Sequence, residues 1–139
     1  MNILSAETEV PVKFNEVDSL GIVWHGHYVR YFEDGREAFG SQYGMGYADI
    51  HRQGYVIPVV RVVSDYKKPL YYGDTAIVKA EYIDCDAAKL IFRYEIRRKS
   101  NKEIVATGET VQVLLNKQGE LLLTLPEFIN EWKHRNNLR

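Results

Sequence analysis

The feature that most constrains the fold is one long helix-periodic segment followed by a run of strand-like segments. Between residues 26 and 40, apolar or small residues recur at spacings of three and four, which is one face of an α-helix. These residues are Tyr28, Tyr31, Phe32, Gly35, Ala38 and Phe39. One helix cannot cover both faces of an antiparallel sheet, but such a sheet can curl around it. The order of segments therefore predicts an α+β fold, a curved sheet wrapped around a long central helix.

The strand-like segments are marked by alternation of apolar and polar residues. One lies before the helix, at residues 7–15, and four follow it, at 55–63, 75–82, 89–97 and 104–116. Further helices are predicted at residues 47–53 and 125–134, where Pro126 suits a first turn. Short turns separate the later strands, so the sheet is predicted to have five antiparallel strands.

Four local features carry more specific expectations. Segment 55–63 is apolar on both alternating faces, which indicates a central or an interface strand, and Pro58 inside it indicates a bulge or a lapse in pairing. The apolar register of 104–116 shifts near Gly108, which predicts a second bulge. Gly35 costs about 0.5–1 kcal/mol relative to Ala in a helix, so a neighbour is expected to pack closely there. Gly40 and Gly44 are candidate stops for the long helix.

Length and composition favour one soluble globular domain covering residues 1–139. The net charge of −1 gives no global attraction to nucleic acid or to an anionic membrane. The lone Cys85 allows no internal disulfide, which is compatible with a reducing compartment. The N-terminal segment lacks the pattern of a signal peptide, and no apolar run approaches about 20 residues. These observations predict a cytoplasmic protein without a membrane span.

The candidate site lies in residues 12–28, VKFNEVDSLGIVWHGHY. This segment runs from a predicted strand through a turn that holds Asp18 and Gly21, and His25 follows near the helix start. The first turn of a helix offers unpaired N–H groups and a partial positive charge. A carboxylate beside such donors can attack a carbonyl or activate water, while the donors stabilise the oxyanion. Asp18 could also be a turn residue that bonds to nearby backbone amides.

The same residues resemble the active-site signature of the 4-hydroxybenzoyl-CoA thioesterase family of hot-dog-fold proteins. The matching positions are Asp18, Gly21, Ile22, Val23, His25 and Tyr28. Val17 stands where that family usually has Thr or Cys. The order of predicted elements is similar to the family over nearly the whole chain, so the resemblance implies a hot-dog fold.

The resemblance implies hydrolysis of an acyl thioester, with coenzyme A as part of the substrate and no separate cofactor. Asp18 is then the nucleophile or the general base, and the backbone N–H at His25 is the oxyanion donor. The His25 ring would orient the substrate or Asp18, or serve only as a packing residue at the helix start. Gly21, Val23, Trp24 and Tyr28 are predicted to contact the substrate. His25 and His27 diverge at a helix start, so no metal site is predicted.

An acyl-CoA substrate needs cations for its phosphates. The candidates chosen among the basic residues are Lys67, Lys68, Lys89 and Arg93, each of which could equally lie on a solvated sheet face. Similar proteins assemble as dimers or dimers of dimers, so a homodimer or homotetramer is expected. Two other functions remain open, a thioesterase for acyl groups on acyl carrier protein and a non-catalytic protein that binds acyl thioesters.

Overall fold

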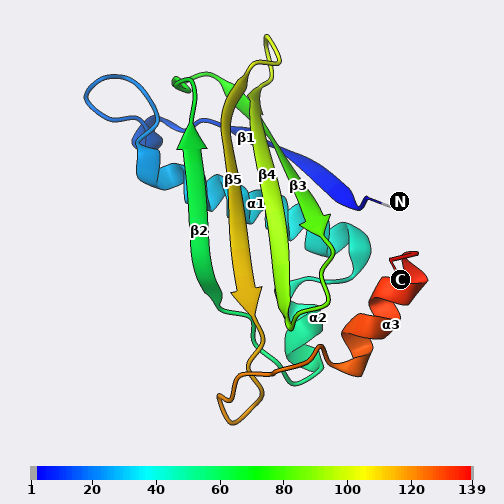
Figure 1. Ribbon diagram of the computed structural model, residues 1–139. Coiled ribbons are helices and arrows are strands. Elements are labelled where there is room, and N and C mark those ends of the chain that lie inside the picture. Colours follow the sequence, from blue (N-terminus) through cyan, green and yellow to red (C-terminus); the bar gives the residue numbers. More distant parts are fainter. Residues whose placement is uncertain (1–2, 139) are drawn as a thin grey trace.

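The computed structural model describes residues 3–138, which form one curved sheet with a long helix across it (Figure 1). The strands are β1 (Ser5–Pro11), β2 (Val59–Tyr66), β3 (Thr75–Ile83), β4 (Lys89–Arg98) and β5 (Ile104–Val113). The helices are α1 (Tyr28–Tyr43), α2 (Tyr47–Arg52) and α3 (Glu127–Arg135), and two 3₁₀ turns are η1 (Phe14–Glu16) and η2 (His25–His27). Among these helices none is long and apolar enough to cross a membrane.

The sheet has five strands in the order β1-β3-β4-β5-β2, and every neighbouring pair is antiparallel. Helix α1 lies against its concave face, so the predicted α+β architecture is confirmed (Figure 1). The first and second strands of the chain become the two edges, because β1 pairs only with β3 and β2 only with β5 within the described residues.

Helix α1 packs through the aromatic face that the sequence predicts. Phe32 stacks on Tyr94 of β4 with 4.8 Å between ring centroids, and Phe39 meets Phe92 edge to face at 5.0 Å. The helix continues through Gly40 and ends at Gly44, whose left-handed backbone (φ 68°) is the usual glycine stop.

Two glycines allow the helix to lie close to the sheet. A Cβ on Gly35 of α1 would lie 2.8 Å from Val78 Cγ1 of β3, so the predicted close approach at Gly35 is confirmed. On the other side of the contact, a Cβ on Gly108 of β5 would lie 2.3 Å from Cζ of Phe32. Gly108 therefore accommodates an aromatic ring from the helix.

The predicted bulge at Gly108 is wrong, because this residue pairs in register with both neighbouring strands. The pattern shifts there because two polar residues of β5 face the core with satisfied hydrogen bonds. Thr110 Oγ1 bonds to the Tyr94 hydroxyl at 2.8 Å, and Gln112 Oε1 accepts a hydrogen bond from Arg36 Nε at 3.2 Å.

Strand β2 begins later than the sequence pattern predicts. Pro58 precedes the strand instead of lying inside it, and the irregular pairing falls between Val59 and Arg61. Because β2 is an edge strand, the central-strand alternative is wrong. Val60 is 59% exposed on this edge, and the interface-strand alternative stays a prediction.

Helix α3 covers the end of the sheet farthest from the η2 turn (Figure 1). Trp132 of α3 contacts Tyr82 edge to face at 5.2 Å, and the buried Lys133 ammonium pairs with Asp84 Oδ1 at 2.6 Å. The C-terminal segment thereby fastens the turn between β3 and β4.

Candidate active site

Asp18 lies at the base of a short hairpin-like loop between η1 and η2. Val17 bridges Val23 in antiparallel fashion, and the Asp18 N–H donates to the Ile22 carbonyl at 2.8 Å. Gly21, with φ +80°, donates to the Asp18 carbonyl at 2.9 Å and allows the chain to reverse. The loop projects beside the C-terminal end of β2 (Figure 1).

The Asp18 carboxylate has both a structural contact and a place in a pocket. Its Oδ1 accepts a hydrogen bond from the Leu20 N–H at 2.8 Å, so the turn-residue interpretation is correct for one oxygen. Among residues 3–138 no hydrogen bond is made to Oδ2. The carboxylate lines a pocket of about 330 Å³. The other lining residues are Ile22, Val23, His25, Tyr28, Tyr66, Lys67, Lys68 and Pro69.

The pocket also receives the start of a helix. Turn η2 runs directly into α1, so the chain is helical from His25 onward. The first N–H groups of a helix have no intrahelical acceptor, which here concerns the amides of His25 and Gly26. The later amide of His27 is already bonded to the Trp24 carbonyl at 2.9 Å. A carboxylate and a helix N-terminus thus meet at one pocket, the arrangement that can stabilise an oxyanion.

Aromatic residues hold the walls of this pocket. The Tyr66 hydroxyl donates to the His25 carbonyl at 3.0 Å, and the two rings lie edge to face with 6.2 Å between centroids. Tyr28 is buried, which raises the pKa of its hydroxyl, and its ring meets Tyr66 edge to face with 5.1 Å between centroids, while the Val23 N–H donates to the Leu70 carbonyl at 2.8 Å. The end of β2 and the loop after it are thereby tied to the first turns of the helix.

The structure brings together only part of the predicted set. Val23, His25 and Tyr28 line the pocket with Asp18, whereas Gly21 and Trp24 do not. Trp24 is half exposed, and its ring covers Gly26, where a Cβ would lie 2.1 Å from Trp24 Cζ3.

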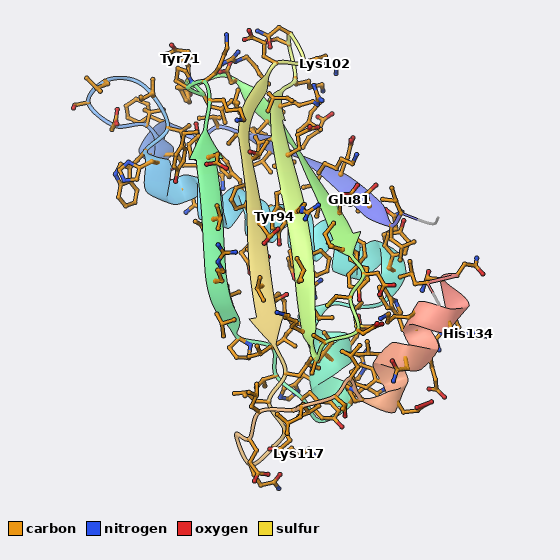
Figure 2. All side chains as sticks on the ribbon, viewed as in Figure 1. Tyr71, Glu81, Tyr94, Lys102, Lys117 and His134 are labelled. Carbon is orange, nitrogen blue, oxygen red and sulfur yellow. The ribbon has the colours of Figure 1, made fainter. Side chains whose placement is uncertain are left out.

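Of the four side chains predicted to bind the phosphates, two line the pocket and two do not. Lys67 and Lys68 line the pocket, although Lys68 Nζ is paired with Glu103 at 3.2 Å. Tyr71 is bridged to Ile22 of the Asp18 loop, so it marks the end of the sheet that holds the candidate pocket (Figure 2). Lys89 is the first residue of β4 and lies at the opposite end. Arg93 lies on the outer face of the sheet and pairs with Glu109 at 3.2 Å. Neither Lys89 nor Arg93 lines the candidate pocket.

The sequence alone did not identify Tyr66 and Pro69, which reach the pocket where the end of β2 and the loop after it contact residues 22–25. Nothing local marks them, since the pocket residues around them belong to the earlier 18–28 segment; the His25 carbonyl that Tyr66 binds lies 41 residues earlier in the chain. In the described part of the chain, no group of three His, Cys, Asp or Glu side chains could hold a metal ion.

Comparisons with known proteins identify the family of the chain. The family model of the thioesterase-like superfamily matches residues 12–133. The chain belongs to this thioesterase superfamily. As a member, it is a thioester hydrolase by class, and the resemblance inferred from residues 18–28 is confirmed.

Three relatives of this thioesterase show the range of the likeness. The candidate acyl-CoA thioesterase YneP of Bacillus subtilis is 37% identical over 109 residues, 78% of this chain and 79% of that protein. The acyl-acyl carrier protein thioesterase ATL3 of Arabidopsis thaliana is 27% identical over 110 residues, 79% of this chain and 58% of that protein. The crystal structure of the DHNA-CoA thioesterase from Staphylococcus aureus has a TM-score of 0.84 at 27% identity, covering 96% of this chain and 88% of that one. The fold is the hot-dog fold that the resemblance implied.

Proposed function

We propose that this thioesterase hydrolyses acyl-CoA thioesters to the free acid and coenzyme A, with Asp18 as the reacting carboxylate. The observation that carries the proposal is that Asp18 and the helix start at His25 line the same pocket of about 330 Å³. A thioester carbonyl placed between them would meet an oxygen nucleophile on one side and amide donors on the other.

Two routes of thioester hydrolysis use the same residues. In one, an Asp18 oxygen bonds to the carbonyl carbon, the carbon–sulfur bond breaks, coenzyme A leaves as the thiolate, and water cleaves the resulting anhydride. In the other, Asp18 takes a proton from water as the water oxygen bonds to the carbonyl carbon; the carbon–sulfur bond then breaks, and coenzyme A leaves as the thiolate, which can take the proton back from Asp18. In both, the His25 and Gly26 amides would carry the negative charge that forms on the carbonyl oxygen.

Coenzyme A is the preferred carrier because the pocket rim is basic. Lys67 and Lys68 both line it, and, among the ion pairs of the described residues, only Lys68 has an acidic partner. Lys67 is therefore the better placed cation for a nucleotide phosphate. The likeness to an acyl carrier protein thioesterase supports that carrier as the second candidate.

A homo-oligomer built through β2 is part of the proposal. The strand is a sheet edge, and its exposed valines would be covered if two copies paired their β2 strands antiparallel. Light scattering tests this directly. Val60→Lys would shift the mass toward the monomer if the edge pairs, and an unchanged mass would contradict pairing through β2.

The proposed chemistry is tested by thiol release from short, long and aromatic acyl-CoAs. Asp18→Asn should lower kcat by about 100- to 10,000-fold while the fold and acyl-CoA binding persist. Asp86→Asn is the matched control, since Asp86 is an exposed carboxylate in the turn between β3 and β4. Full activity in Asp18→Asn would refute the assignment. No activity of the wild-type protein on any acyl-CoA, with binding intact, would favour a non-catalytic binding protein.

A further inference from the structure

Glu16, the last residue of η1, is a buried acidic residue at the base of the Asp18 loop. Its exposed fraction is 3%. A carboxylate is rarely buried unless hydrogen-bond donors or cations surround it. The groups that surround this side chain therefore indicate its role.

Three donors surround the Glu16 carboxylate. Oε1 accepts hydrogen bonds from the Lys13 N–H at 2.7 Å and from the Tyr31 hydroxyl at 2.9 Å. Oε2 forms an ion pair with Arg30, so two successive residues of α1 hold the side chain. Burial by itself raises the pKa of Glu16, but these hydrogen bonds and the Arg30 charge bring the pKa below its usual value. An ionised carboxylate is acceptor-only, so it accepts from all three donors without placing a proton of its own among them.

The main chain of the same residue holds the other side of the loop. The Glu16 carbonyl accepts a hydrogen bond from the Trp24 N–H at 2.9 Å. Trp24 directly precedes His25, and Val17 directly after Glu16 is bridged to Val23. Residue 16 is thus fastened to the chain that enters the loop, to the chain that leaves it, and to helix α1.

We propose that Glu16 is a positioning residue that sets the placement of the Asp18 carboxylate relative to the His25 amide. The inference rests on the proposed function of Asp18. Asp18 lies two residues after Glu16, and the helix start lies one residue after Trp24. The positions of both the Asp18 carboxylate and the His25 amide therefore depend on Glu16. A displacement of about 1 Å between reacting groups can cost about 100-fold in rate.

The chemistry of the cluster predicts how substitutions rank. Glu16→Gln keeps the size but offers one acceptor oxygen, and its amide group would face donors. Glu16→Asp keeps the charge on a shorter side chain and should retain part of the hydrogen bonding. Tyr31→Phe removes one of the three donors and should have the smallest effect.

The test combines kinetics with backbone hydrogen exchange. For Glu16→Gln, we expect a 10- to 100-fold loss of kcat with KM changed less than about threefold. Glu16→Asp should recover part of that loss. The matched control is Lys133→Met, which removes the buried ion pair with Asp84 beneath α3, outside the candidate pocket. This control should lower the melting temperature and leave kcat unchanged.

Hydrogen exchange separates this inference from the proposed function. The Asp18 and Trp24 amides should exchange faster in Glu16→Gln, whereas those of β3 and β4 should not. A protein without thioesterase activity would refute the proposed function, and the exchange data would still decide whether Glu16 holds the loop. Unchanged exchange at these amides, or a kcat loss no larger than in Lys133→Met, would overturn the inference. If Glu16→Gln does not fold, Tyr31→Phe decides, with a few-fold loss of kcat and faster Trp24 exchange expected.

Discussion

The close contact between Gly108 and Phe32 predicts a large and local loss of stability in Gly108→Ala. The added methyl carbon would lie 2.3 Å from Phe32 Cζ and 2.7 Å from the Val63 carbonyl oxygen. Ordinary contact begins near 3.4 Å, so the ring would have to retreat by about 1 Å. Phe32 is fully buried and stacks on Tyr94, so little space exists for that movement.

Overpacking of a close-packed core costs about 1–3 kcal/mol, and this overlap places Gly108→Ala at about 3 kcal/mol. For a chain of this length, that loss lowers the melting temperature by about 10 °C. Urea unfolding followed by circular dichroism measures the loss at equal protomer concentrations, because oligomerisation would shift the apparent stability.

A double-mutant cycle checks the cause. Phe32→Leu removes the clashing ring edge, so Gly108→Ala should cost less in that background, with a coupling of at least about 1 kcal/mol. A Gly108→Ala protein within about 0.5 kcal/mol of wild type would refute this account of helix–sheet packing. Two purely additive substitutions would show that Phe32 is not the group displaced.

Two further results follow from the charges around the site. Lys67→Ala should raise KM for acyl-CoA about fivefold, as expected for one exposed ion pair of about 1 kcal/mol, and leave kcat unchanged. Arg93→Ala should have no such effect, and a short N-acetylcysteamine thioester without phosphates should show none with either variant. Because the pKa of Glu16 is lowered in the folded protein, its ionised form adds stability above the unfolded-state pKa near 4.5. That contribution disappears as pH falls through the folded-state pKa. The difference in free energy of unfolding between wild type and Glu16→Gln, measured by urea unfolding, should therefore narrow below pH 4.5. A difference independent of pH would contradict the assignment of an ionised Glu16.

The order and type of the main elements could be predicted because each is marked by its own periodicity. The aromatic face of α1 and the alternation in β3 and β4 depend on residues three, four or two apart, which the sequence displays directly. The loop of Asp18 was also predictable, because turn residues and a helix start follow each other within one segment.

Features that depend on distant partners could not be predicted. The apparent bulge at Gly108 results from Thr110 and Gln112, which face the core because their hydrogen-bond partners lie on β4 and α1. The start of β2 is set by its register with β5. The direction of each basic side chain also depends on register, which places Arg93 on the outer sheet face. Glu16 gave no signal, because its donors become neighbours only when α1 folds against η1.

The most direct test of the central claim is a crystal structure of Asp18→Asn with an intact acyl-CoA bound. The account predicts the thioester carbonyl oxygen about 3 Å from the His25 or Gly26 backbone nitrogen, with the carbonyl carbon facing residue 18. The nucleotide phosphates should lie near Lys67. Two other hollows offer a direct contrast: one on the outer sheet face, lined by Arg93, and one lined by Tyr47 and His51. A thioester bound in either of them would contradict the assignment of the active site.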